Sequence, residues 1–137
     1  MSGSIQDNLA EDVTFEGTAM NAVLRGREAV SDQLDVVIGF YEDKSESFTV
    51  DTGEYIVREN HATVDGRPIK AILVLHRNPE GQFDRVIVTH RPLSAALTFS
   101  RLVAESRIGA ESDPNRFYRP TGQTYQDLLD YADRNPD

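Results

Sequence analysis

The spacing of apolar residues changes several times along the chain, and each spacing predicts a helix or a strand. Residues 5–10 have the spacing of a short helix, and apolar and polar residues then alternate from about 12 to 19, as in a half-buried strand. From 27 to about 42, apolar side chains recur every three or four residues, which predicts a long amphipathic helix. No internal repeat interrupts this order, so the pattern indicates one α+β domain.

Three strands are expected after the long helix, because turn sequences divide this part of the chain. The turns fall at 51–53, 65–66 and 78–81. Asp65-Gly66 supplies the positive φ angles that a tight hairpin requires. We therefore predict an antiparallel meander whose strands cover 54–64, 67–76 and 82–91.

Two further helices are predicted in the last part of the chain. Pro92 has no backbone N–H and ends the third strand, after which an apolar-to-small face predicts a helix from 93 to about 107. Pro and Gly dipeptides then indicate an irregular extension, followed by a short amphipathic helix around 125–132. We expect 1–107 to form the domain and 108–137 an extension whose helix packs on the domain or on a partner subunit.

Composition and charge narrow the classes of partner. The 137 residues suit a single domain, and 14 Lys and Arg against 23 Asp and Glu give a net charge of 14 − 23 = −9. This charge disfavours nucleic acid and anionic membranes, and we expect neither as a partner. The chain has no cysteine, no export signal and no apolar stretch near the roughly 20 residues of a membrane span. We predict a cytoplasmic protein.

The order of the predicted elements and the strings 8–15, 24–30, 66–68 and 91–93 together mark the part of the chain from about 5 to 107. In these features the chain resembles the nuclear transport factor 2-like superfamily, and within it the SnoaL-like proteins. It implies an α+β fold of the cystatin-like roll type, in which a curved, cone-shaped antiparallel or mixed sheet wraps around helices and encloses an apolar pocket. This fold hosts isomerases, cyclases, hydrolases, transport adaptors and binding proteins, so the resemblance does not select a function.

Strand parity identifies the residues that would line such a pocket, because successive side chains of a strand lie on opposite faces. The resemblance implies which set of each strand is concave. These sets are Ile56, Arg58, Asn60, Ala62 and Val64; Ile69, Ala71, Leu73 and Leu75; and Asp84, Val86, Val88 and His90. A few polar groups in an apolar cavity are typical of a ligand site. The predicted ligand-binding residues are Arg58, Asn60, His90, Leu73, Val88 and, from the helix stripe, Tyr41.

Each polar candidate also has a structural alternative. A buried Arg58 needs a carboxylate, which either a ligand or an ion pair within the domain supplies. His90 is either a hydrogen-bonded wall residue or an acid or base, and Tyr41 is either a core aromatic residue or a cavity residue. Parity places His61 and His76 on the face opposite His90, so the histidines do not converge. We expect no metal site and no cofactor.

The favoured hypothesis is a protein that binds a small apolar ligand whose polar end meets Arg58, Asn60 and His90. The resemblance implies inward carboxyl groups in ketosteroid isomerases, whereas Asp84 is the one inward acid of the predicted meander. The alternative is a polyketide-cyclase-like or ketosteroid-isomerase-like enzyme, with His90 as catalytic acid or base and Arg58 stabilising an enolate. A protein-interaction domain is a third possibility, and whether the chain is an enzyme stays open.

We also expect a homodimer formed through the outer face of the sheet. Parity makes this face partly apolar, with Val57, Ile72, Val74 and Ile87 on it. An apolar sheet face is normally covered, and a second copy of the chain is the expected cover.

Overall fold

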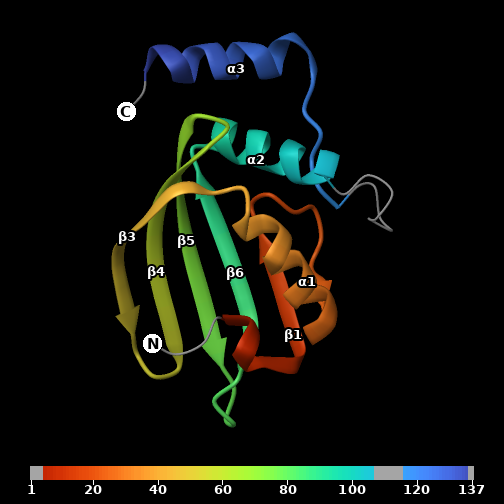
Figure 1. Cartoon of the computed structure of the whole chain (residues 1–137), viewed down its shortest axis with the longest axis vertical. Helices are drawn as coiled ribbons and strands as arrows, with labels where there is room; N and C mark the ends of the chain where they lie inside the picture. The colour runs from red at the N-terminus through yellow and green to blue at the C-terminus, as the bar shows by residue number, and fades with distance from the viewer. Residues whose placement is uncertain (1–4, 107–115, 136–137) are drawn as a thin grey trace.

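The computed structural model describes residues 5–106 and 116–135. Over these residues, one mixed sheet of six strands curves around α1 and is crossed at one end by α2 (Figure 1). The strand order is β2-β1-β6-β5-β4-β3, with β1 parallel to β6 and the other neighbours antiparallel. The elements are a 3₁₀ turn (Ile5–Asn8), β1 (Leu9–Gly17), β2 (Leu24–Arg25), α1 (Arg27–Ile38), β3 (Glu42–Asp51), β4 (Tyr55–Val64), β5 (Arg67–Arg77), β6 (Phe83–Arg91), α2 (Leu93–Ser106) and α3 (Gly122–Arg134). The predicted α+β fold with a curved mixed sheet is confirmed.

The meander has four strands, one more than predicted, because α1 ends at Ile38 and β3 follows it. The N–H groups of Gly39 and Phe40 bond to carbonyls three residues earlier, so the last turn tightens and the helix stops. The acidic Glu42 and Asp43 would also oppose the negative end of a longer helix. Every side chain of β3 is exposed, so no apolar alternation marks this edge strand in the sequence.

Strand parity places the core correctly except at the start of β6. The expected concave residues of β4 and β5 that are buried are Ile56, Ala62, Val64, Ile69, Ala71, Leu73 and Leu75. In β6, a bulge opposite His76 and Arg77 inserts one residue, so Phe83 is buried in the core. Asp84 lies instead with His76 on the outer face, with 2.5 Å between its Oδ1 and the Nδ1 of His76. The expectation that Asp84 is an inward acid is therefore wrong.

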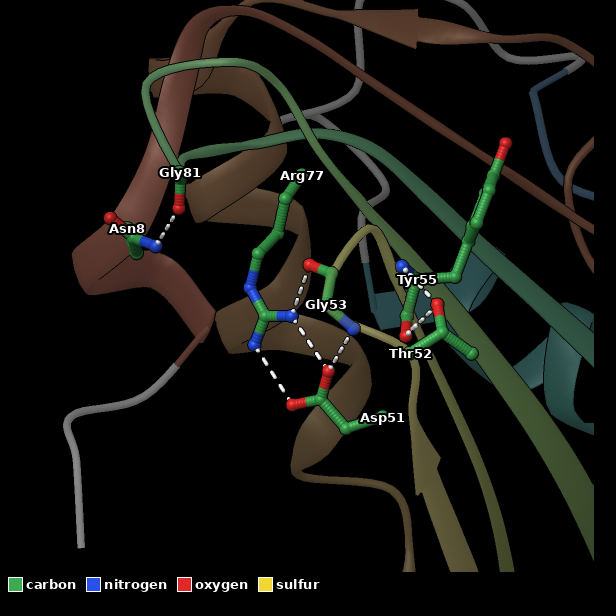
Figure 2. Close-up of polar contacts among 7 residues, drawn as sticks. All are labelled: Asn8, Asp51, Thr52, Gly53, Tyr55, Arg77 and Gly81. Atoms are coloured by element: carbon green, nitrogen blue, oxygen red, sulfur yellow. Dashed lines mark hydrogen bonds and ion pairs between the residues drawn. The ribbon is translucent and has the colours of Figure 1, made fainter.

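Polar contacts fix the turn between β3 and β4 at one end of the sheet (Figure 2). The guanidinium of Arg77 binds both carboxylate oxygens of Asp51, at 2.9 and 3.1 Å, and donates to the carbonyl of Gly53 at 2.8 Å. Nearby, the Asn8 side-chain amide donates to the Gly81 carbonyl at 2.8 Å. The edge strand β3 is thus tied to the end of β5, two strands away in the sheet.

The described part of the C-terminal extension packs on the domain of its own chain. Helix α3 lies against α2, on the side of α2 that faces away from the sheet (Figure 1). The hydroxyls of Tyr125 and Thr98 are 2.7 Å apart, and Leu129 is buried. Residues 107–115 lie outside the described residues. Among the described helices, none is long and apolar enough to span a membrane.

Candidate functional site

A cavity of about 90 Å³ lies inside the cone, between the concave face of the sheet, α1 and α2. Its walls are mostly apolar, with Phe99 of α2 and Leu34 of α1 among them. Four of the described lining residues carry polar side chains. These are Tyr41, Lys44, Asn60 and His90. No described lining residue is a carboxylate, so the cavity is apolar with a small polar region on one wall.

Two of the polar lining residues, Asn60 and His90, lie in one row across the sheet, on either side of Ala71. Asn60 of β4 pairs with Ala71 of β5, and Ala71 pairs with His90 of β6. Neighbouring strands are about 4.8 Å apart, so Asn60 and His90 are separated by about two strand spacings. Because Ala71 carries only a methyl group, the space above it is open to a ligand that contacts both polar residues.

His90 is held by contacts on several sides. Its Nε2 lies 2.5 Å from the hydroxyl oxygen of Tyr41, and its ring centroid is 4.9 Å from that of Phe99. Its backbone N–H donates to the hydroxyl of Thr18 at 3.0 Å, which fixes the strand at this point. The side chain is only 6% exposed, and its Nδ1 has no hydrogen-bond partner among the described residues.

Burial keeps both partners of this pair uncharged at neutral pH. It lowers the pKa of His90 to about 4, and it raises the pKa of the Tyr41 hydroxyl above its ordinary value of 10. The imidazole is then neutral, with one nitrogen protonated and the other free to accept. Nε2 shares a proton with Tyr41, so Nδ1 is the nitrogen left to donate or accept one further hydrogen bond.

Arg58 does not line the cavity, which corrects the expectation that it does. It is on the concave side of β4, in register with Leu73, but its guanidinium turns towards β3. Its Nε lies 3.1 Å from the hydroxyl of Thr49 and 3.3 Å from Oε1 of Glu46. Of the two alternatives for Arg58, the structure therefore contains the ion pair within the domain, with Glu46 as the carboxylate. Strand parity gives the face of the sheet to which the Cα–Cβ bond points, but it does not give the position of the end group of a long side chain.

The other predicted residues do reach the cavity. Leu73, Val88, Asn60 and His90 line it, and so does Tyr41, which follows the end of α1. Whether these residues bind a ligand stays a prediction. Within the described residues, no three His, Asp or Glu side chains are grouped as metal ligands would be.

Lys44 and Phe117 are among the lining residues that were not predicted from the sequence. Lys44 belongs to β3, the strand that the apolar pattern did not reveal. Phe117 comes from the C-terminal extension, is 4% exposed, and forms a β-bridge with Met20. The adjacent aromatic residues Phe117 and Tyr118, in a segment rich in turn residues, were the available signal for it.

Comparison with solved structures identifies the fold. The chain is similar to a steroid delta-isomerase from Pseudomonas aeruginosa, with a TM-score of 0.72 and 21% identity over 77% of this chain and 78% of that chain. It is also similar to an uncharacterised bacterial protein with a cystatin-like fold from Silicibacter pomeroyi, with a TM-score of 0.72 and 20% identity over 79% of this chain and 76% of that chain. An NTF-2-like protein of unknown function from Burkholderia xenovorans matches with a TM-score of 0.52 and 13% identity, over 61% and 64% of the two chains.

No family model and no curated protein sequence matches the chain. The similarity to solved structures is therefore one of fold. The chain has the nuclear transport factor 2-like, cystatin-like fold, and its cavity lies between the concave face of the curved sheet and the helices.

Proposed function

We propose that the protein binds a small apolar ligand with one polar group inside the cone, as a SnoaL-like binding protein. The row of Asn60, Ala71 and His90 carries this proposal, because it sets two polar side chains around an open space in an apolar cavity. A buried polar atom without a partner costs about 1–3 kcal/mol, so the unpartnered Nδ1 of His90 favours a ligand that supplies a hydrogen bond.

The size of the cavity limits the ligand. At about 90 Å³ it is smaller than the roughly 150 Å³ engineered cavity that takes up benzene. The enclosed part of the ligand is therefore a short aliphatic chain or a small ring, and any larger part extends towards the exposed Ile38 and Lys44 at the mouth.

A titration with hexan-1-ol, followed by NMR, tests this proposal. We expect the amide and methyl signals of Ala71, Leu73 and Val88 to shift and to saturate together. Ala71→Phe fills the space between the polar residues and should abolish the shifts, whereas Ile72→Phe, on the opposite face of the same strand, should leave them unchanged. Dispersed NMR signals show that each variant is folded. Shifts that appear only at outer-face residues, or that persist in folded Ala71→Phe, would contradict the proposal.

A proton-transfer enzyme is the second candidate, and the hydrogen bond between Tyr41 and His90 favours it. A neutral imidazole within 2.5 Å of a phenol hydroxyl is able to move a proton at a carbon next to a ligand carbonyl. The structural similarity to a steroid delta-isomerase makes isomerisation of a β,γ-unsaturated ketone the reaction to test. Against it, the described cavity wall lacks a carboxylate, and Arg58, the expected enolate stabiliser, is paired with Glu46.

Cyclohex-3-enone is a suitably small substrate for this test. Turnover to the conjugated enone above the buffer rate, lost in His90→Gln and reduced in Tyr41→Phe, would support the enzyme. Equal rates for wild type and His90→Gln would contradict the enzyme hypothesis. The binding proposal would be unaffected, because the hexan-1-ol titration tests it separately.

A further inference from the structure

Lys44 is the one charged side chain among the described residues that line the cavity. Its Nζ lies 5.9 Å from the ring centroid of Tyr41, within reach of a cation–π contact. It takes part in none of the ion pairs formed by the described residues. The cavity mouth therefore carries a positive charge without a carboxylate partner in the described protein.

A β-bulge in the edge strand brings Lys44 to this position. Glu42 pairs with Thr63 and Ser45 with His61, so Asp43 and Lys44 together oppose the single residue between those partners, Ala62. Asp43 has a φ of 51°, the left-handed conformation found in bulges of this kind. Ala62 lines the cavity, and the bulge sets Lys44 beside it on the concave side.

The other charges on the concave side of β3 cancel each other. The next concave residue along the strand, Glu46, is paired with Arg58 at 3.3 Å. Among the described residues, Lys44 is thus the positive charge at the mouth that no carboxylate compensates, in a protein whose net charge is −9. One cation compensates a single negative charge, whereas a dianion such as a phosphate monoester would keep one uncompensated charge and meet twice the repulsion of the chain's net negative charge.

We propose that the ligand is an amphipathic monocarboxylate, with its carboxylate at Lys44, its aliphatic part against Ala62, and the polar group of the proposed function over Ala71, between Asn60 and His90. This inference rests on the proposed binding function and narrows its ligand class. The exposed position of Lys44 leaves the carboxylate partly hydrated, while the enclosed part of the ligand meets almost only apolar side chains. A carboxylate at the mouth and a mostly apolar body in the cone match the distribution of charge and apolar surface along the cavity.

Hexanoate and hexan-1-ol form a matched pair of probes, equal in chain length and different in charge. Lys44→Gln removes the charge at the mouth and keeps a polar side chain that is one atom shorter. Lys70→Gln is the matched control, because Lys70 is the only other lysine of the chain and lies on the outer face of β5. The dissociation constant of each probe is measured from NMR shifts of cavity residues, at low salt and again in 1 M NaCl.

We expect Lys44→Gln to weaken hexanoate about three- to fivefold at low salt, the range of a partly exposed ion pair, and to leave hexan-1-ol unchanged. Lys70→Gln should behave as wild type, and high salt should remove most of the difference. If hexan-1-ol binds but hexanoate binds wild type and Lys44→Gln equally, this inference is wrong and the binding function stands. If neither probe shifts the cavity signals, the binding function fails and this inference fails with it.

Discussion

His90 should make the protein less stable in acid, by an amount that its burial determines. Its pKa is about 4 in the folded protein and 6.5 when exposed, so between these values the unfolded chain binds a proton that the folded protein does not. Stability from this residue is complete above pH 6.5 and is lost as the pH falls towards 4. Each pKa unit corresponds to 1.36 kcal/mol, which gives a loss of about 2 kcal/mol by pH 5 and about 3 kcal/mol by pH 4.

Urea denaturation of wild type and His90→Gln between pH 4 and 8 measures this loss. His76, between Asp84 and Glu54, and the other titrating groups contribute to both proteins and cancel in the difference between them. The free energy of unfolding of wild type minus that of the variant should therefore fall by about 2 kcal/mol from pH 7.5 to pH 5. A difference that does not change with pH would mean that His90 is solvated, and would refute the assignment of the cavity wall. The histidine NMR titration gives a second test, with a midpoint near 4 expected for His90.

Three further substitutions test the packing and the assembly. In Gly17→Ala the new Cβ would lie 2.2 Å from the carbonyl oxygen of Val88, so we expect a loss of about 2 kcal/mol or more in urea denaturation. Ser100→Ala removes a buried hydroxyl that accepts from the Tyr118 N–H at 2.8 Å, and unfolding should become easier by about 1–3 kcal/mol. We expect a homodimer of 2 × 15.3 = 30.6 kDa by light scattering, and Val74→Glu, on the outer sheet face, should dissociate it.

Matched controls keep these predictions specific. Gly39→Ala has ordinary contacts, the nearest at 3.5 Å, and a right-handed φ of −67°, so it should be neutral or slightly stabilising. Ser106→Ala removes only a local bond to Val103 and should change stability by less than about 0.5 kcal/mol. Leu93→Glu, at an exposed apolar position outside the sheet, should leave the molecular mass unchanged. A wild-type mass near 15.3 kDa would contradict the predicted dimer. A Gly17→Ala variant as stable as wild type would contradict the close approach of β1 and β6.

The sequence predicts those parts of the fold in which burial determines residue type. Alternation in β5 and turn residues such as Asp65-Gly66 mark the central strands, because one face of each is buried. The edge strand β3 has no buried face, so its polar side chains give no such signal. A bulge is also invisible to parity, because one inserted residue reverses the assignments on one side of it, as at Phe83 and Asp84 at the start of β6.

The cavity was predicted less completely than the sheet, for reasons that follow from side-chain length and chain distance. Short or ring-bearing residues such as Asn60 and His90 stay where parity puts them, whereas Arg58 spans the distance to Glu46 on the next strand. Lys44 reaches the site through a bulge, and Phe117 through a tertiary contact with a segment almost a hundred residues away. Local patterns contain neither kind of information.

The parallel pairing of β1 with β6 has a consequence for how the protein folds. Leu9 lies beside Phe83, so closing this pair restricts a loop of more than 70 residues, whereas β4, β5 and β6 are joined by short hairpins. Non-local pairing is slow to form, and the three hairpin strands should therefore associate first. Before β1 pairs with β6, the apolar side chains on the concave face of β4, β5 and β6 are exposed to water. A ligand that needs the closed cone would then bind only the native state, so its affinity would appear directly as a higher melting temperature.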